Sequence, residues 1–263
     1  MSNDILTRII ECKKQEIRES KAIISEKKLC SQAFNTCDRR PFIEKFKLPG
    51  INIIAEIKRA SPSKGPINMV LDPAFYAKAY EKGGAVALSV LTEKIFFKGS
   101  PQDLEIARAA TSLPVLRKDF IISEYQMYET VLMGADAVLL IVRCLSEDRL
   151  KQLIDLSREL KLETLVEIHT ESDLERATTA GAQLIGINNR NLQTFETNLA
   201  TAMQLVSLLK EYQMPVAASG IGNRKDIENN LNVGINNFLI GESLVKADDP
   251  VGFLLKLRGE QQR

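Results

Sequence analysis

Two kinds of hydrophobic pattern alternate along the chain from Ile51 onward. Short runs that are apolar on both faces indicate strands buried in a parallel sheet, and stretches with apolar residues every three or four positions indicate amphipathic helices. The pattern predicts strands at Ile51–Ile57, Ala85–Leu91, Pro114–Leu116, Ala137–Val142, Thr164–Ile168, Leu184–Ile187, Pro215–Ala218 and Asn237–Ile240. It predicts helices between and after them at Pro73–Lys82, Pro101–Ala110, Ser123–Met133, Glu147–Leu160, Glu171–Ala180, Asn198–Lys210, Arg224–Leu231 and Pro250–Arg258.

A strand followed by a helix, repeated eight times within 263 residues, predicts the α/β class and a single closed (β/α)8 TIM barrel. Glycines such as Gly134 and Gly181 support the count, because glycine readily takes the left-handed conformation that closes a helix. A doubly wound open sheet is the main alternative. No G-x-G-x-x-G follows the first predicted strand, which weakens the dinucleotide-binding version of that alternative.

The first 49 residues precede the repeating pattern. Apolar residues at helical spacing predict an amphipathic helix from Asp4 to about Lys28, capped by Asn3 or Asp4. A second short helix is expected at Phe42–Phe46, before Pro49 and Gly50. We therefore expect one domain over residues 1–263, with a helical extension at 1–49 and the barrel at 50–263.

Composition narrows the class of protein. The hydrophobic fraction of 44% is typical of a globular protein, and the net charge of +1 gives no electrostatic reason to expect nucleic acid as a partner. No apolar run is long enough to span a bilayer, and the N-terminus lacks the hydrophobic region of a signal peptide, so we expect no membrane association and a cytoplasmic location. Four cysteines without C-x-x-C spacing and a single histidine, His169, predict reduced thiols and no zinc site.

Polar residues gather where the predicted strands end. In a barrel these carboxyl ends meet at one face, which carries the active site. Burying several charged groups at one end of a core is costly, so a purely structural explanation of the set is weak and we interpret it as a catalytic site. The residues are Glu56, Lys58 and Ser61 at the end of the first strand, Lys118 at that of the third, Glu167 at that of the fifth, and Asn188 and Arg190 at that of the sixth.

The last two strands end instead in small residues, Ser219-Gly220 and Gly241-Glu242. Glycine lets the backbone approach a ligand, and barrels frequently hold a phosphate at these two positions, which predicts a phosphate site. Phe97 and Phe120 are candidates for a flat apolar slot. Glu167, placed among apolar neighbours, is predicted to have a raised pKa. His169 is interpreted as a loop or helix-capping residue.

Several stretches together resemble the indole-3-glycerol-phosphate synthase family of tryptophan biosynthesis. They are IIAEIKRASPSKG, SVLTEKIFFKGS, LRKDFIISEYQ, GADAVLLIV, LVEIHTESDLERA, IGINNRNLQTFE, ASGI and FLIGESLV. The resemblance covers nearly the whole chain. It implies ring closure, decarboxylation and dehydration of 1-(2-carboxyphenylamino)-1-deoxyribulose 5-phosphate to indole-3-glycerol phosphate, CO2 and water. It implies a carbon–carbon lyase that needs no cofactor or metal, acts on a phosphorylated small molecule and is a monomer, with other enzymes of the pathway as possible partners.

The resemblance also implies residue roles. Lys118 is the general acid, and Glu167 works with Glu56 and Lys58 in the proton transfers, without a fixed assignment of each transfer. Lys58 and Arg190 are placed for the anthranilate carboxylate, and Asn188 for the polar chain. Phe97 and Phe120 belong to the binding site of the ring, and Leu139 is a further substrate-binding position. Ser61, Gly220, Gly241 and the backbone N–H of Glu242 hold the phosphate, and Ser219 is a further catalytic position.

The chain departs from the family pattern at one place. The sequence before Ser-Gly-Ile usually has Glu, whereas Ala218 stands here, and we expect one secondary substrate contact to be lost. Two alternatives fit the strand ends less well, because these ends carry Lys, Glu and Asn and only Ala218 departs from the pattern. One is another phosphate-binding barrel enzyme, such as the isomerase of the preceding pathway step, which would pair Cys with Asp at its strand ends. The other is a catalytically silent barrel that serves as a binding subunit, which would have lost its charged strand ends.

Overall fold

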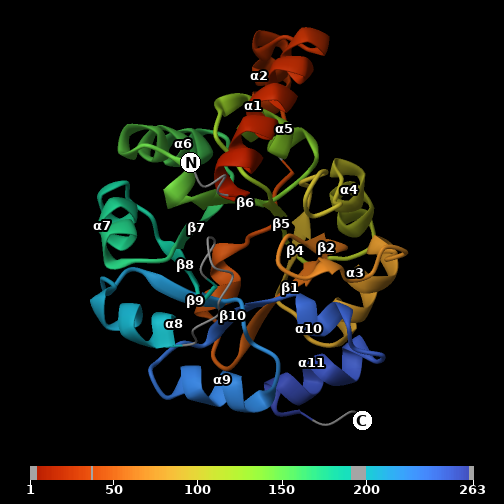
Figure 1. Ribbon diagram of the computed structural model, residues 1–263, viewed down its shortest axis with the longest axis vertical. Helices are drawn as coiled ribbons and strands as arrows, with labels where there is room; N and C mark the ends of the chain where they lie inside the picture. The colour runs from red at the N-terminus through yellow and green to blue at the C-terminus, as the bar shows by residue number, and fades with distance from the viewer. Residues whose placement is uncertain (1–4, 37, 191–199, 261–263) are drawn as a thin grey trace.

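The computed structural model describes residues 5–36, 38–190 and 200–260 (Figure 1). Its centre is a closed barrel of parallel strands in the order β1-β10-β9-β8-β7-β6-β5-β4. The predicted (β/α)8 barrel is therefore confirmed. The strands are β1 (Asn52–Ile57), β4 (Ala87–Leu91), β5 (Val115–Lys118), β6 (Ala137–Ile141), β7 (Glu163–Ile168), β8 (Leu184–Asn188), β9 (Met214–Ala218) and β10 (Asn237–Ile240).

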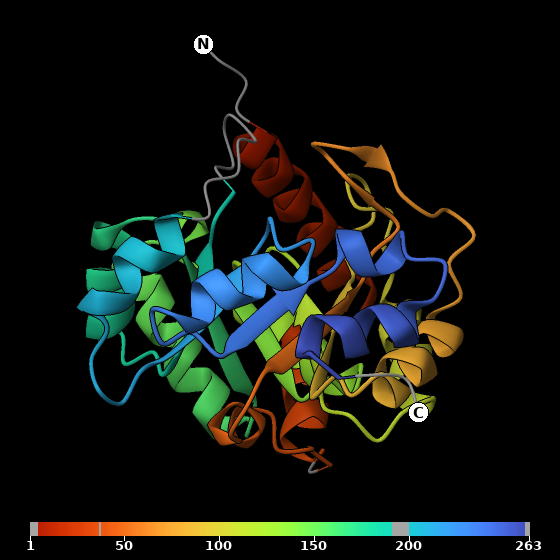
Figure 2. The same cartoon turned by 90° about the horizontal axis from the view of Figure 1, so that it is seen from below.

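Helices surround the barrel on its outside (Figures 1 and 2). They are α3 (Pro73–Lys82), α4 (Pro101–Ala109), α5 (Glu124–Leu132), α6 (Glu147–Glu159), α7 (Glu171–Thr179), α8 (Ala200–Leu205), α9 (Arg224–Leu231), α10 (Glu242–Val245) and α11 (Pro250–Arg258). Side chains such as Ser100, Ser123 and Thr170 accept hydrogen bonds from the first-turn amides of their helices. These caps fix where each helix begins after its strand-end loop.

Element boundaries differ from the sequence expectation by a few residues. β5 continues to Lys118, because Lys118 still pairs with Leu91 of β4. The helix expected at Asn198–Lys210 begins outside the described residues. Within them it is the short α8 followed by a 3-10 turn, η3 (Val206–Leu208). Another 3-10 turn, η2 (Val142–Cys144), follows β6.

The N-terminal extension is helical, as predicted, but the single helix expected over 4–28 is wrong. The chain forms α1 (Ile5–Ile23) and α2 (Glu26–Phe34), and the proposed caps Asn3 and Asp4 lie outside the described residues. Ser25 takes an extended conformation, and its side chain accepts a hydrogen bond from the amide of Lys28. Ser25 therefore interrupts the helical backbone after α1 and is the N-cap of α2. The second expected helix is a 3-10 turn, η1 (Ile43–Lys47).

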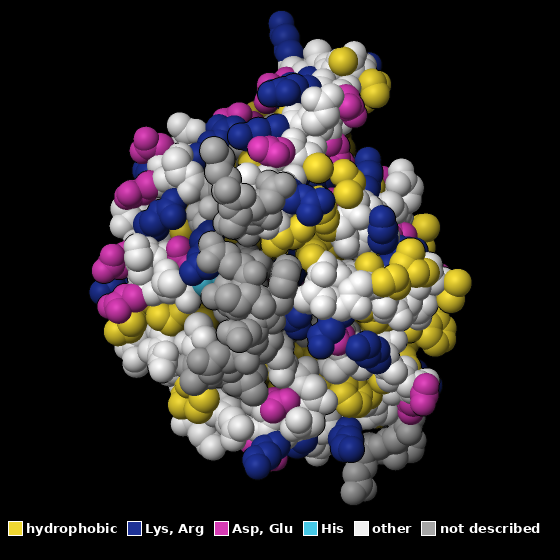
Figure 3. Space-filling model, viewed as in Figure 1, with side chains coloured by type: hydrophobic (Ala, Val, Ile, Leu, Met, Phe, Trp, Pro, Cys, Tyr) yellow, Lys and Arg dark blue, Asp and Glu magenta, His cyan; other side chains and the backbone are white. Residues whose placement is uncertain are grey.

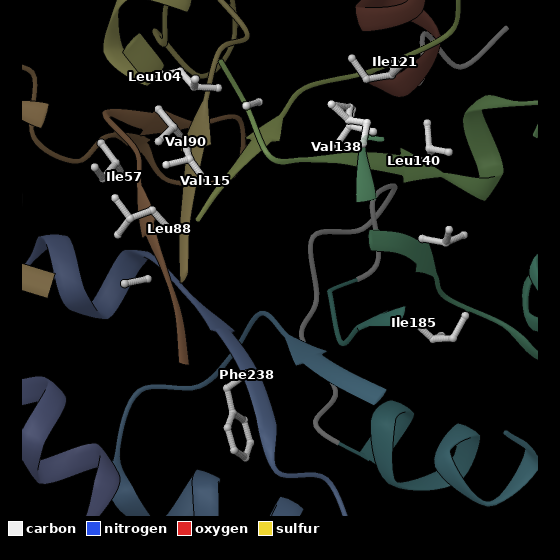
Figure 4. Packing of buried hydrophobic residues seen from close by; sticks show 14 of the residues in the cluster. Ile57, Leu88, Val90, Leu104, Val115, Ile121, Val138, Leu140, Ile185 and Phe238 are labelled. Atoms are coloured by element: carbon white, nitrogen blue, oxygen red, sulfur yellow. The ribbon is translucent and has the colours of Figure 1, made fainter. Parts of the chain in front are cut away.

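Two apolar layers hold the barrel. Figure 4 shows the outer layer, in which Val90, Val138 and Ile185 point from the strands toward the helices. The inner layer consists of alternate residues on the same strands, such as Leu116, Leu139 and Leu165. Because side chains alternate along a strand, the inner register of β5, β7 and β8 continues into Lys118, Glu167 and Asn188. The strand period thus places these polar groups above the inner apolar layer.

The extension contributes to both ends of the barrel. Phe42 and Phe46 join the inner layer, and the backbone amides of Phe42 and Ile43 donate to Glu163, the first residue of β7, both at 2.6 Å. They therefore close the end of the barrel where the strands begin. The first turns of α1 lie at the opposite end, where the strands finish.

No helix in the described ranges has the length and apolar character needed to cross a membrane. Cys12, Cys30 and Cys144 are free thiols, as predicted, while Cys37 lies outside the described residues.

Candidate active site

A cavity of about 440 Å³ opens at the carboxyl ends of the strands. Figure 3 views this end of the barrel and shows Lys and Arg side chains around the centre of the face. All candidate site residues from the sequence line this one cavity: Glu56, Lys58, Ser61, Phe97, Lys118, Phe120, Leu139, Glu167, Asn188, Arg190, Ser219, Gly220, Gly241 and Glu242. The convergence that the strand ends predict is therefore present, whereas the role of each residue stays a prediction.

Two ion pairs occupy the floor of the cavity. The Nζ of Lys118 lies 3.4 Å from Oε2 of Glu167, which joins the ends of β5 and β7. The Nδ2 of Asn188 donates to the other oxygen, Oε1, at 3.1 Å. On β1, the Nζ of Lys58 lies 2.6 Å from Oε1 of Glu56. Both carboxylates are buried, and both lysines are partly open to the cavity.

The electrostatics of the Lys118–Glu167 pair correct one expectation. Burial raises the pKa of Glu167, but the positive charge of Lys118, with His169 and the Asn188 hydrogen bond, outweighs it and lowers this pKa below its usual value. The predicted raised pKa of Glu167 is wrong because that prediction considered only the apolar neighbours. Burial lowers the pKa of Lys118, but Glu167 and Glu56 raise it above the ordinary value. The resting pair is therefore an ammonium beside a carboxylate.

His169 does not cap a helix through its side chain. Its ring is buried, with Nε2 3.8 Å from Oε1 of Glu167, and neither ring nitrogen has a hydrogen-bond partner in the described part of the chain. Its backbone N–H donates to Asp173, which belongs to the capping box of α7. Burial lowers the pKa of His169, so its imidazole is the neutral form at neutral pH.

One wall of the cavity is apolar. The rings of Phe97 and Phe120 lie 6.1 Å apart between centroids and are tilted by 44°, with Leu139 on the floor. The sequence reasoning missed two contributors to this wall. Glu93 accepts the backbone amides of Ile95, Phe96 and Phe97, which holds the loop that carries Phe97.

The second missed contributor is α1. Ile5, Leu6 and Ile9 line the cavity, so the extension forms part of the site. Apolar residues at the start of an amphipathic helix were the only sequence signal, and they do not reveal which partner surface the helix covers.

The opposite wall consists of the two glycine turns. Ser219 and Gly220 have positive φ angles of 68° and 81°. For a serine this conformation is strained by about 1 kcal/mol or more, a cost that backbones bear mainly at functional sites. At Gly241 the limit is space, because a Cβ would lie 3.0 Å from Cβ and Cδ of Glu56, and closer still to its Oε1. Gly241 therefore lets the Glu56 side chain lie directly against the end of β10.

Arg190 connects the glycine side to the loop after β1. That loop contains a small antiparallel ladder, β2 (Ala60–Ser61) and β3 (Gly65–Pro66), which the sequence reasoning missed. The Nη1 of Arg190 donates a hydrogen bond to Ser63, in the turn between β2 and β3, and its Nη2 lies 3.6 Å from Glu242. No group of three or more His, Cys, Asp and Glu side chains suited to a metal ion occurs among residues 5–36, 38–190 and 200–260.

Comparisons with known proteins identify the family of the chain. The model of the family described as indole-3-glycerol phosphate synthase matches residues 6–257. An indole-3-glycerol phosphate synthase of Desulfosudis oleivorans is 56% identical, covering 97% of this chain and 98% of its own length. One from Syntrophobacter fumaroxidans is 48% identical and covers 98% of both.

Solved structures agree at the level of the fold. A 3-hexulose-6-phosphate synthase from Salmonella typhimurium superposes with a TM-score of 0.63 at 14% identity, covering 80% of this chain and 97% of that one. An N-acetylmannosamine-6-phosphate 2-epimerase from Clostridium perfringens gives 0.60 at 13% identity, with 79% and 93% covered. These likenesses show the barrel alone, whereas the family model matches residues 6–257 and the close relatives cover 97% and 98% of the chain. The chain therefore belongs to the indole-3-glycerol phosphate synthase family.

Proposed function

We propose that the cavity converts 1-(2-carboxyphenylamino)-1-deoxyribulose 5-phosphate to indole-3-glycerol phosphate, CO2 and water, the carboxy-lyase step of tryptophan biosynthesis. The observation that carries the proposal is the Lys118–Glu167 pair, 3.4 Å apart, in one cavity with the apolar wall and the two glycine turns. The substrate has an aromatic acid, a ketose chain and a phosphate. The cavity offers an apolar slot, polar strand ends and a glycine-rich wall in matching positions.

Lys118 is proposed as the general acid of ring closure. As an aromatic carbon attacks the ketone, negative charge develops on the ketone oxygen, and an ammonium placed there stabilises it and gives up a proton. The raised pKa of Lys118 keeps the proton on the lysine until that charge appears. Such proton transfer typically contributes about 10²–10⁴-fold to the rate.

The carboxylates are proposed to complete the reaction. Loss of CO2 restores the electrons to the ring system, and the anilino nitrogen of the substrate itself serves as the electron sink, so the step requires no added organic cofactor. Loss of the hydroxyl then needs an acid and a base. Glu167, ionised and held by Asn188, is suited to remove the proton from carbon. The Lys58 ammonium of the Glu56–Lys58 pair is suited to give a proton to the hydroxyl, which leaves as water.

The remaining contacts are proposed to orient the substrate. Phe97, Phe120 and Leu139 take the aromatic ring, while Lys58 and Arg190 take its carboxylate. The phosphate lies across the cavity, at Ser61, Gly220, Gly241 and the backbone N–H of Glu242. The left-handed conformations of Ser219 and Gly220 turn the backbone after β9 so that both residues line the cavity.

The direct test mixes the purified protein with this substrate, without added cofactor, and follows the appearance of indole absorbance or fluorescence. The expected result is stoichiometric formation of indole-3-glycerol phosphate and CO2. The substrate of the preceding pathway isomerase is the specificity control and should remain unchanged. Absence of indole at saturating substrate would refute the proposal.

The proposal retains the sequence expectations of a single domain over 1–263, a monomer and a cytoplasmic location. Sedimentation of the purified protein tests the monomer, and fractionation of the source cells tests the location.

A further inference from the structure

A buried ionic cluster lies behind the catalytic end of β5 and reaches the cavity at Asp119. Its centre is Lys13 of α1, which is only 2% exposed although it carries a charge. The Lys13 ammonium contacts two carboxylates, Asp119 at 2.9 Å and Glu16 at 2.8 Å. Burying an ammonium this deeply costs desolvation free energy, which only close contacts with carboxylates can offset.

Asp119 is the partner that reaches the active site. It stands in the chain between Lys118 and Phe120, which both line the cavity. Its Oδ1 accepts from the backbone N–H of Phe120 at 2.8 Å as well as from Lys13. Its Oδ2 accepts from the hydroxyl of Thr92 at 2.6 Å and from the guanidinium of Arg117 at 3.1 Å. One carboxylate therefore fixes the backbone between the proposed general acid and a ring-binding phenylalanine.

The charges of the cluster come from four elements. Lys13 and Glu16 belong to α1, Arg117 and Asp119 to β5 and its end, and Glu129 on α5 lies 3.7 Å from Arg117. Lys94, after β4, lies 3.4 Å from Glu16. Burial raises the pKa of Asp119, but Lys13 and Arg117 outweigh it and hold this pKa at about 2. Burial lowers the pKa of Lys13, but Asp119 and Glu16 raise it above its ordinary value.

We propose that Lys13 is a positioning residue: through Asp119 it fixes Lys118 and Phe120, and it couples their placement to the docking of α1. The same helix brings Ile5, Leu6 and Ile9 to the cavity, so α1 supplies both a wall of the site and the cation that orders its catalytic strand end. The inference rests on the proposed role of Lys118.

A purely structural role makes a different prediction. If Lys13 only neutralised Asp119 for folding, its removal would lower the melting temperature and leave the turnover of the folded enzyme unchanged. If it positions the segment from Lys118 to Phe120, turnover falls in the folded enzyme, because small displacements of a catalytic group are costly.

The experiment compares Lys13→Met with Lys21→Met. Lys21 lies on the same helix and makes an exposed 2.8 Å pair with Glu26. Its ammonium also lies over the ring of Tyr125, 5.7 Å from the centroid, and neither contact belongs to the Lys13 cluster. Both variants are assayed for kcat and KM at a temperature at which circular dichroism shows them folded. We expect kcat of Lys13→Met to fall by about tenfold or more and that of Lys21→Met to stay within about twofold. Wild-type-like kcat in folded Lys13→Met would overturn the inference and leave the proposed function standing, whereas an inactive wild-type enzyme would refute the proposed function.

A second measurement covers the case in which Lys13→Met does not fold. Native-state hydrogen exchange of the wild-type protein compares the amide of Phe120 with the α1 amides around Lys13. The proposal expects one common opening free energy and one common denaturant dependence for both. A Phe120 amide protected about tenfold more strongly than those α1 amides would show that the helix detaches without loosening β5, which contradicts the coupling.

Discussion

Substitution of Gly241 by alanine tests whether the placement of Glu56 matters for catalysis. A Cβ at this position would lie 3.0 Å from Cβ and Cδ of Glu56, whereas carbon atoms prefer separations of about 3.5–4.0 Å. The Glu56 side chain must therefore move by roughly 0.5–1 Å, which follows from the same carbon–carbon distances. Such a movement breaks or lengthens the 2.6 Å contact between Glu56 and Lys58.

The magnitude follows from this displacement. A misplacement of about 1 Å in an active site costs on the order of 10²-fold in rate, which corresponds to roughly 2.7 kcal/mol in the activation free energy. Overpacking itself lowers the free energy of unfolding by about 1–3 kcal/mol. We therefore expect Gly241→Ala to reduce kcat/KM by about 10²-fold while the protein still folds.

The assay is indole formation at steady state, with thermal unfolding of each variant measured in parallel. Gly222→Ala is the matched control for overpacking, because its Cβ would meet nothing nearer than Asp226 at 3.9 Å, and we expect a change of about 0.5 kcal/mol or less in the free energy of unfolding. The effect of Gly241→Ala should also shrink when Glu56 is replaced by alanine, since the two residues act through one contact. A kcat/KM of Gly241→Ala within about threefold of the wild type would refute the reasoning.

Three further predictions follow from the site. Lys118→Ala should lower kcat by about 10²-fold or more through loss of the general acid; near-normal turnover would remove Lys118 from that role. Asp119, with a folded pKa of about 2 against an ordinary 3.8, should contribute stability above pH 4 that is lost as the pH falls toward 2. The free energy of unfolding should fall by about 2 kcal/mol over this pH range, and urea unfolding of Asp119→Asn should show no such fall. Ala218→Glu should lower KM by about tenfold, because the new carboxylate would add about one charged hydrogen bond to the substrate. An unchanged KM would show that this departure from the family pattern does not affect substrate binding.

The barrel was predictable because its two periodicities are local. Runs that are apolar on both faces mark the strands, and their alternation of inward and outward positions continues into Glu56, Lys118 and Glu167. The convergence of these residues on one cavity follows from the register alone. The break between α1 and α2 was missed because Ser25 reads as an ordinary polar position until its capping geometry is seen.

The parts of the site that escaped prediction depend on contacts between distant segments. The lowered pKa of Glu167 comes from Lys118, 49 positions earlier in the chain and two strands away in the barrel. Lys13 looks like one more exposed charge on an amphipathic helix, yet it is buried against Asp119. Glu93 appears to belong to a polar loop, but its carboxylate orders three amides beside Phe97. Periodicity cannot reveal pairings of this kind, because they depend on which loop lies over which strand end.

The cations that line the cavity already have protein partners, which affects how the cavity binds the carboxylate of a substrate. Lys58 is engaged by Glu56, and Arg190 is shared between Ser63 and Glu242. A substrate carboxylate therefore meets cations whose charge is already partly neutralised, and it must compete with a protein carboxylate for them. A buried carboxylate that loses its cation is destabilised, because the charge is then buried without a partner. Binding of a substrate carboxylate at Lys58 must therefore compensate for the Glu56 contact that it displaces.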